Sequence, residues 1–401
     1  MKKALKTTLI TLGFIAAALA ILLIVSSILY SPEYVCHCIA NGESKITDYT
    51  MFPERVIAKS SDPYAYTYAI DDTFCDREVS YRSGGEPATQ KLEDLLAQNG
   101  TTSFIVIQND IVICEQYFNG YDQNSVETSF SSVKSLDSLM MGIAIEDGYI
   151  KSVDQPVSDF IQEFKGTPFE DITIEQLLMM RSDIRYEEGL AWFTDDAKTY
   201  YSPDMRDLVL NHMRIDAGYS GQFHYNNYHP LILGMILERA TGMHVADYFA
   251  LKVWDKIGAE HDASWSLDSE RSGFEKMESG LNFISIDYAK IGSMLLHKGV
   301  WNGNAIVSED WLLRSTIAPQ PLAPEDIDSD FLKDIEVGYQ YMWYSTENDQ
   351  GGHDFFSAGK YGQYIYVSPE NGTVIVRTGS STGGVDWWPD VFRQIASSIQ
   401  G

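Results

Sequence analysis

The chain has 401 residues, of which 44% are hydrophobic and 21% charged, the balance of a folded globular protein rather than a disordered one. At about 100 to 200 residues per domain, this length allows two or three structural units. Lysine and arginine number 29 against 57 aspartates and glutamates, and the resulting net charge of −28 repels polyanions, so nucleic acid is excluded as an expected partner.

The first segment of the chain predicts a membrane anchor. Lys2, Lys3 and Lys6 precede an uncharged run of 22 residues, 9–30. A helix needs about 20 apolar residues to cross a bilayer, whereas the core of a cleavable signal has about 7 to 15. The lysines on its N-terminal side place that end in the cytoplasm. We therefore expect residues 1–30 to form one transmembrane helix in the inner (cytoplasmic) membrane, with the body on the extracytoplasmic, periplasmic side; a cleaved signal is the alternative.

Residues 31–90 form a lead-in segment rich in turn residues, and it contains most of the cysteines. An exported body permits disulfides, so Cys36 or Cys38 can bridge to Cys75. Cys114 lies in an apolar run and is expected to be a buried free thiol. The cysteine spacing does not resemble a zinc site and the histidines lack the pairing of a His-Glu-x-x-His helix, so neither a metal nor another cofactor is expected.

A hairpin is predicted early in the main domain, which we place at residues 91–401. A loop over residues 83–87 precedes a helix near residues 90–99. Two β-branched runs, 104–108 and 111–114, then flank the turn dipeptide Asn-Asp.

Helical signals dominate the middle of the chain. Apolar residues recur at helical spacing after Ser131, and Gly148 is placed to end that helix. Residues 173–176 have the form of a capping box. Residues 230–239 predict a further helix that Gly242 closes.

Strand signals return late, over residues 363–367 and 373–377, around the turn-rich stretch 368–372. Strands at both ends with helices between them predict an α/β (α+β) fold. In it, one sheet is built from the two ends of the domain, and an all-helical region is inserted in the middle.

Ser131 and Lys134 form a Ser-x-x-Lys tetrad at a predicted helix start, where residues three apart lie on one face about 5 to 6 Å apart at Cβ. A serine hydroxyl becomes a nucleophile when a neighbouring base takes its proton, and a buried lysine can be such a base. Backbone N–H groups at the helix start also favour a developing anion. The structural alternative is an N-cap serine followed by a solvated lysine.

Two further elements can complete such a site. Tyr225 and Asn227 form a Tyr-x-Asn motif, in which the phenol can relay a proton and the amide can hold a substrate group. Alternatively, Tyr225 is a half-buried loop aromatic. The small residues of the stretch 357–359 precede the late hairpin and let a substrate backbone approach closely.

The order and spacing of these three elements resemble those of the serine β-lactamases, penicillin-binding proteins and related esterases. Residues 177–183 are similar to the family's Leu-Leu-x-His-x-Ser-Gly loop, and residues 299–303 to another of its motifs. Residues 52–57 and 359–364 look most like the class C-like branch that includes 6-aminohexanoate-dimer (nylon-oligomer) hydrolase. The resemblance implies a β-lactamase/transpeptidase-like antiparallel sheet flanked by helices, with the site beside a helical domain.

The resemblance also implies roles. Ser131 is the acyl-accepting nucleophile, Lys134 its base, Tyr225 the proton relay and Asn227 a supporting polar group. The backbone N–H groups of Ser131 and Lys360 form the oxyanion hole.

One departure from the family pattern bears on the substrate. The third motif is usually Lys-Thr-Gly, which binds a substrate carboxylate, but here it is Ser357-Ala358-Gly359. Lys360 can compensate in part for the missing lysine, but its side chain is expected to face the opposite way, because it lies one residue further along the strand. A carboxylesterase or small-amide hydrolase acting on a small-molecule ester or amide is therefore favoured. A β-lactamase, a D-Ala-D-Ala peptidase and a non-catalytic binding member of the fold are the alternatives. An α/β-hydrolase is disfavoured, because the sequence contains no Gly-x-Ser-x-Gly elbow.

Overall fold

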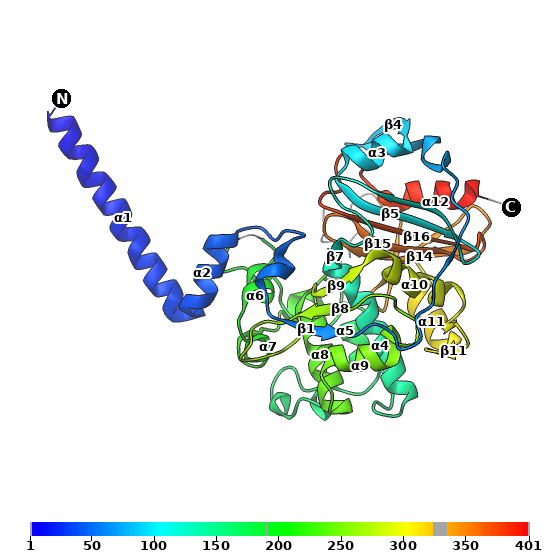
Figure 1. Cartoon of the computed structure of the whole chain (residues 1–401). Coiled ribbons are helices and arrows are strands. Elements are labelled where there is room, and N and C mark those ends of the chain that lie inside the picture. Colours follow the sequence, from blue (N-terminus) through cyan, green and yellow to red (C-terminus); the bar gives the residue numbers. More distant parts are fainter. Residues whose placement is uncertain (1, 190, 324–334, 400–401) are drawn as a thin grey trace.

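The structure, a computed structural model, describes residues 2–189, 191–323 and 335–399. Its central sheet has eight strands in the order β12-β13-β14-β15-β16-β5-β6-β2 (Figure 1). β5 (Thr101–Gln108) pairs antiparallel with β16 (Thr373–Gly379), so the two ends of the domain share one sheet, as predicted. The edge strand β2 (Thr67–Tyr68) departs from the antiparallel expectation, since it pairs in parallel with β6 (Ile111–Tyr117). The other strands are β12 (Gly338–Gln340), β13 (Trp343–Glu347), β14 (His353–Gly359) and β15 (Gln363–Ser368).

The turns of the two predicted hairpins have the backbone that their residues favour. Asn109 and Asp110, between β5 and β6, have φ of 47° and 65°. Short polar side chains tolerate this left-handed region, and it suits the twist of a tight hairpin. Gly372, between β15 and β16, has φ of 58°. Both hairpins therefore form where the local sequence predicts them.

Helices cover both faces of the central sheet (Figure 1). On one face, Phe392 of α12 (Trp388–Ser398) packs near Phe104 of β5, with ring centroids 6.5 Å apart. On the other face, α10 (Ser285–Leu296) lies so close that a Cβ on Gly292 would come within 2.3 Å of Val374. Because both faces are covered, β5 is buried almost throughout and its sequence shows no polar alternation.

The middle of the chain is largely helical, as predicted. The capping box at the start of α5 (Ile174–Leu178) is present, with Thr173 and Gln176 each accepting from the other's backbone N–H. α8 (Tyr228–Thr241) ends at Gly242, whose φ of 72° is the usual glycine C-cap. The remaining helices of the body are α3 (Leu92–Gln98), α4 (Lys134–Glu146), α6 (Asp195–Tyr201), α7 (Met205–His212), α9 (Val245–Phe249) and α11 (Glu309–Thr316).

The inserted region is not all-helical, which corrects the sequence prediction. A second sheet of four strands runs in the order β1-β8-β9-β7. Each of these strands has three or four residues, too few for a periodic pattern to be read from the sequence. Their bounds are β1 (Glu54–Ile57), β7 (Val126–Thr128), β8 (Ala263–Ser266) and β9 (Leu281–Ile284), and a two-stranded ribbon adds β10 (Val300–Trp301) and β11 (Asn304–Ala305).

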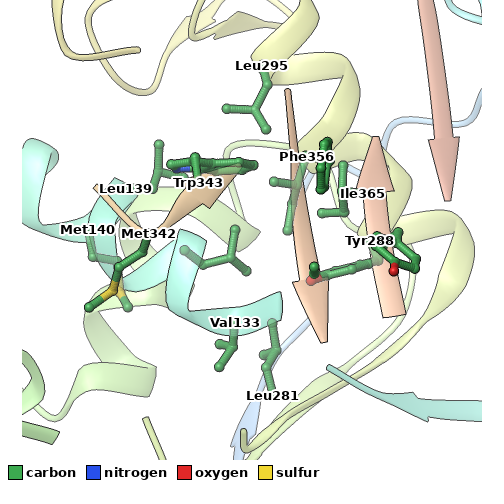
Figure 2. Close-up of a cluster of buried hydrophobic side chains, with 14 of the residues drawn as sticks. Val133, Leu139, Met140, Leu281, Tyr288, Leu295, Met342, Trp343, Phe356 and Ile365 are labelled. Atoms are coloured by element: carbon green, nitrogen blue, oxygen red, sulfur yellow. The ribbon is translucent and has the colours of Figure 1, made fainter. Parts of the chain in front are cut away.

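A dense hydrophobic core fixes α4 against the sheet. Figure 2 shows Leu139 of α4 beside Trp343, with Phe356 of β14 and Leu295 of α10 in the same cluster. Leu139 and Phe356 are fully buried. Because interiors pack at near-crystalline density, the start of α4 is held in a fixed position relative to β14.

The lead-in segment contains more structure than predicted. β3 (Glu78–Ser83) and β4 (Glu86–Lys91) form a hairpin across Gly84 and Gly85, whose φ values are 57° and 84°. α2 (Pro32–Asn41) lies beside α6 (Figure 1). The predicted loop is thus a hairpin turn, and the helix predicted after it is α3.

The expected transmembrane helix is not supported. α1 (Lys2–Tyr30) forms, but among the described residues no helix is both long and apolar enough to cross a membrane. Its last turn packs on the body, where Trp192 donates to the hydroxyl of Ser26 (3.1 Å). The prediction of an anchor was therefore wrong, and the location of the body outside the cytoplasm stays a prediction.

The disulfide that the sequence permits does not form among the described residues, where all four cysteines are free. Cys75 is buried against Cys114, with the two sulfur atoms 3.6 Å apart, while Cys36 is exposed on α2. Cys114 is a buried thiol, as predicted. The pairing with Cys75 failed because α2 lies beside α6 rather than near the central sheet.

Candidate active site

The turn that carries Ser131 is strained and rigid. Phe130, the preceding residue, has φ of 43°, a left-handed conformation that costs a non-glycine residue energy. A short 3₁₀ segment, Phe130–Val133, leads into α4, so the helix begins at Lys134 rather than at Ser131. The strain is held by packing, since the Phe130 ring meets the ring of Tyr361 edge to face, with centroids 5.4 Å apart.

Lys134 is placed to exchange a proton with Ser131. Its Nζ lies 2.6 Å from the Ser131 Oγ and donates a second hydrogen bond to the backbone carbonyl of Glu278 (3.1 Å). The residue is almost fully buried. These two contacts direct the amine at the serine hydroxyl and away from solvent.

The Tyr-x-Asn motif lies on the opposite wall, just before α8. The ring of Tyr225 faces Lys134, whose Nζ is 4.9 Å from the ring centroid. Asn227 donates from its Nδ2 to the hydroxyl of Tyr186 (2.6 Å), and its Oδ1 has no hydrogen-bond partner within the described part of the chain. The structure therefore brings Tyr225 and Asn227 to the same pocket as Ser131.

The end of β14 packs directly against the turn that carries Ser131, which we call the nucleophile turn. A Cβ on Gly359 would lie 2.4 Å from the backbone carbonyl oxygen of Ser129 and 3.0 Å from the backbone nitrogen of Ser132. Only glycine permits this approach, which brings the backbone of Lys360 next to the turn of Ser131. An oxyanion hole formed jointly by the backbone N–H groups of Ser131 and Lys360 requires this proximity.

Ser357 does not reach the pocket. Its hydroxyl is fully buried and lies 2.6 Å from the hydroxyl of Ser132, which also contacts the Tyr288 hydroxyl at 2.7 Å. The next residue, Ala358, lines the pocket instead. The prediction that Ser357 contacts the substrate was therefore wrong. The orientation predicted for Lys360 was also wrong, because Lys360 lines the pocket instead of facing away from it.

A pocket of about 510 Å³ surrounds the Ser131 hydroxyl, between the central sheet and the helical region. This volume suits a small organic substrate. Aromatic rings dominate its walls, from Phe130, Tyr200, Tyr201, Tyr225, Tyr344 and Tyr361. Its carboxyl groups are those of Glu43, Glu188, Asp196 and Glu278.

Sequence reasoning missed one wall of this pocket. Gly42, Glu43 and Ser44, just after α2, line it from the lead-in segment. The ammonium of Lys360 pairs with the Glu43 carboxylate (3.0 Å). No local motif marks these residues, because the contacts join positions more than 300 residues apart in the chain.

A buried carboxyl group, that of Asp137, lies near Lys134. Asp137, one turn after Lys134, is fully buried, and neither of its oxygens has a hydrogen-bond partner in the described structure. Burial raises the pKa of Asp137 well above its ordinary value; the charge of Lys134 opposes this and that of Glu278 adds to it. Burial therefore favours the protonated form of Asp137, which carries no negative charge near the lysine.

One cluster in the described residues has the chemistry of a metal site, away from the pocket lining. Ligand atoms of Glu238, His244 and Glu275 lie within 4.8 Å of one another. Arg206 pairs with Glu238 at 2.6 Å and Arg55 with Glu275 at 2.8 Å. The two guanidinium groups already neutralise these carboxylates, so the cluster fits an ion-pair network better than a cation site.

Known proteins match this architecture over most of its length. A family model described as Beta-lactamase matches residues 88–396. The chain is 28% identical to 6-aminohexanoate-dimer hydrolase of Paenarthrobacter ureafaciens over 313 residues, which cover 75% of this chain and 76% of that protein. A Bacillus anthracis structure provisionally named 6-aminohexanoate-dimer hydrolase superposes with a TM-score of 0.76 at 24% identity, covering 89% of this chain and 92% of its own. A family VIII carboxylesterase superposes with a TM-score of 0.54 at 15% identity, covering 75% and 92%.

Proposed function

Since the chain belongs to the beta-lactamase family of serine hydrolases, we propose that it cleaves neutral carboxylic esters, or small amides, through an acyl-enzyme on Ser131. The observation that carries this proposal is the 2.6 Å contact between the Lys134 Nζ and the Ser131 Oγ at the pocket surface. A buried amine in hydrogen-bond contact with an otherwise unactivated hydroxyl is the arrangement that nucleophilic catalysis requires.

In the proposed acylation, the Ser131 oxygen attacks the carbonyl carbon while its proton passes to Lys134. The negative charge that develops on the carbonyl oxygen is stabilised by the backbone N–H groups of Ser131 and Lys360. The bond to the leaving group then breaks, and Tyr225 relays the proton held by Lys134 to the departing oxygen or nitrogen, which leaves Lys134 neutral again. Water enters, loses a proton to the same base, and releases the carboxylic acid with Ser131 restored.

The walls of the pocket support neutral substrates. Ser357, which stands where a lysine would bind a substrate carboxylate, is buried beneath the strand. The ammonium of Lys360 is already paired with Glu43. The aromatic lining offers apolar contact, and its carboxyl groups disfavour an anion. The similarity to the dimer hydrolase named above supports small amides as a second class of substrate beside the esters.

The test compares three substrate classes with the purified full chain. We expect kcat/KM for a short-chain aryl ester to exceed that for a cephalosporin reporter and for a D-Ala-D-Ala peptide, with all activity lost in Ser131→Ala. A preference for the cephalosporin or the peptide would favour a β-lactamase or a peptidase instead. No turnover of any substrate, with no reaction toward a fluorophosphonate, would favour a binding protein.

A further inference from the structure

The side chain of Lys360 places a cation at the pocket, but this ammonium is already paired with the carboxylate of another side chain. Its ammonium lies 3.0 Å from the Glu43 carboxylate and donates to the hydroxyl of Ser44, also at 3.0 Å. Lys360 directly follows Gly359, which packs on the nucleophile turn, so this ammonium lies at the edge of the reaction site. A substrate carboxylate would have to displace Glu43 to bind there.

Glu43 belongs to a segment that is held from both sides of the cleft. From the helical side, the hydroxyl of Tyr201 donates to the backbone carbonyl of Gly42 (2.9 Å). From the sheet side, the hydroxyl of Tyr361 donates to the backbone carbonyl of Ser44 (2.5 Å). We name residues 42–44 the strap. Because both neighbours of Glu43 are fixed, its carboxylate is positioned at Lys360, although the side chain stays about half exposed to solvent.

The remaining charges of the pocket leave no substitute cation. Among the described residues that line it, the basic side chain is that of Lys360. Two buried lysines lie one layer deeper: Lys134, beside Ser131, and Lys276, which already pairs with the Glu278 carboxylate (3.0 Å). Lys134 is engaged by the Ser131 hydroxyl and the Glu278 carbonyl. Lys360 is therefore the group that would bind an anionic substrate, and Glu43 competes for it.

We propose that Glu43 is a specificity-determining residue, which neutralises Lys360 and so weakens the binding of substrates whose acyl group carries a terminal carboxylate. This inference rests on the proposed esterase function and names the substrate class of that site. The pair is partly exposed, so its strength is modest and the discrimination it gives is moderate rather than absolute.

The test uses p-nitrophenyl hexanoate and p-nitrophenyl hydrogen adipate, which have acyl chains of equal length that differ in a terminal carboxylate. In Glu43→Gln, the ratio of kcat/KM for the adipate to that for the hexanoate should rise about three- to tenfold, because Lys360 is released to form a charge-assisted hydrogen bond. Adding Lys360→Gln to that variant should remove the gain. Glu33→Gln is the matched control, since Glu33 is exposed on α2 and does not line the pocket, and it should leave the ratio unchanged.

Three results would overturn the inference: an unchanged ratio in Glu43→Gln, an equal rise in the control, or a gain that persists in the double variant. A wild-type chain that does not hydrolyse the hexanoate would instead refute the proposed function. Calorimetry on Ser131→Ala then separates the two ideas, because it needs no turnover. With Glu43→Gln added, monomethyl adipate should bind about three- to tenfold more tightly, while the affinity for methyl hexanoate should not change. If monomethyl adipate binds Ser131→Ala equally tightly with and without Glu43→Gln, the inference is overturned.

Discussion

The hydroxyl oxygens of Ser132 and Ser357 lie 2.6 Å apart, fully buried beneath the turn that presents Ser131. Ser357 also accepts from the backbone N–H of Ile365 (3.2 Å). The two serines thus join the nucleophile turn to β14 and β15. Ser357 holds the turn of Ser131 in position through this bond and does not line the pocket.

Ser357→Ala should therefore lower the free energy of unfolding by about 1 to 3 kcal/mol, because it leaves buried hydrogen-bonding groups without their partner. Ala358→Ser is the matched control, since Ala358 lines the pocket, and it should alter kcat/KM with a much smaller loss of stability. Urea denaturation and ester kinetics on both variants provide the comparison. Equal stabilities of Ser357→Ala and the wild type would argue against this structural role.

Lys134→Arg should reduce kcat for a neutral ester by at least about a hundredfold. Arginine keeps the positive charge but does not deprotonate at usable pH, so it cannot accept the Ser131 proton. Circular dichroism should show an intact fold. If the variant keeps more than about a tenth of the rate, Lys134 acts only as a cation and the base lies elsewhere.

Tyr225→Phe removes the phenol hydroxyl and leaves the ring facing Lys134. If Tyr225 protonates the leaving group, the loss of kcat should be larger for a more basic leaving group, because such a group needs a proton in order to depart. We expect kcat for an alkyl ester to fall about a hundredfold and that for a p-nitrophenyl ester to fall by less than tenfold. Equal losses for the two esters would show that the hydroxyl serves binding or positioning.

Glu127 predicts a pH dependence of stability. Burial raises its pKa to about 7; hydrogen bonds from Thr102 and Thr378 oppose this, as does the charge of Arg377. An unfolded glutamate loses its proton near pH 4.5, so between about pH 4.5 and 7 the folded state binds more protons. Stability therefore falls as pH rises through this window, by up to about 3 kcal/mol, and the loss persists above it.

Glu127→Gln should remove that dependence, so the variant should gain stability relative to the wild type at pH 8 but not at pH 4. Urea denaturation at both pH values measures the difference. Glu270→Gln, at an exposed position, is the control and should follow the wild-type curve. A Glu127→Gln curve parallel to the wild type would show that the glutamate titrates normally in the folded protein.

Features with a local physical signal could be predicted from the sequence. The Asn109-Asp110 turn, the capping box at Thr173 and the C-cap at Gly242 each depend on residues close together in the chain. The Ser-x-x-Lys spacing likewise anticipated the contact between Ser131 and Lys134, because three residues make one turn.

Features that depend on distant contacts were missed. The strap reaches Lys360 across more than 300 residues, and no periodic pattern marks it. The short strands β8 and β9 have only four residues each, and their pairing is a tertiary effect. The anchor prediction was wrong for a related reason: an apolar run favours a helix, but packing of Ser26 against Trp192 is not visible in composition.

Acylation of the Ser131 hydroxyl is the step on which the proposed mechanism depends most. Treating the full chain with a fluorophosphonate, followed by tandem mass spectrometry that resolves Ser131 from Ser132, tests this directly. We predict one adduct, on the Ser131 oxygen, that is absent from Ser131→Ala and retained in Ser132→Ala, since the Ser132 hydroxyl is fully buried. An adduct on Ser132, or one that survives in Ser131→Ala, would contradict the account.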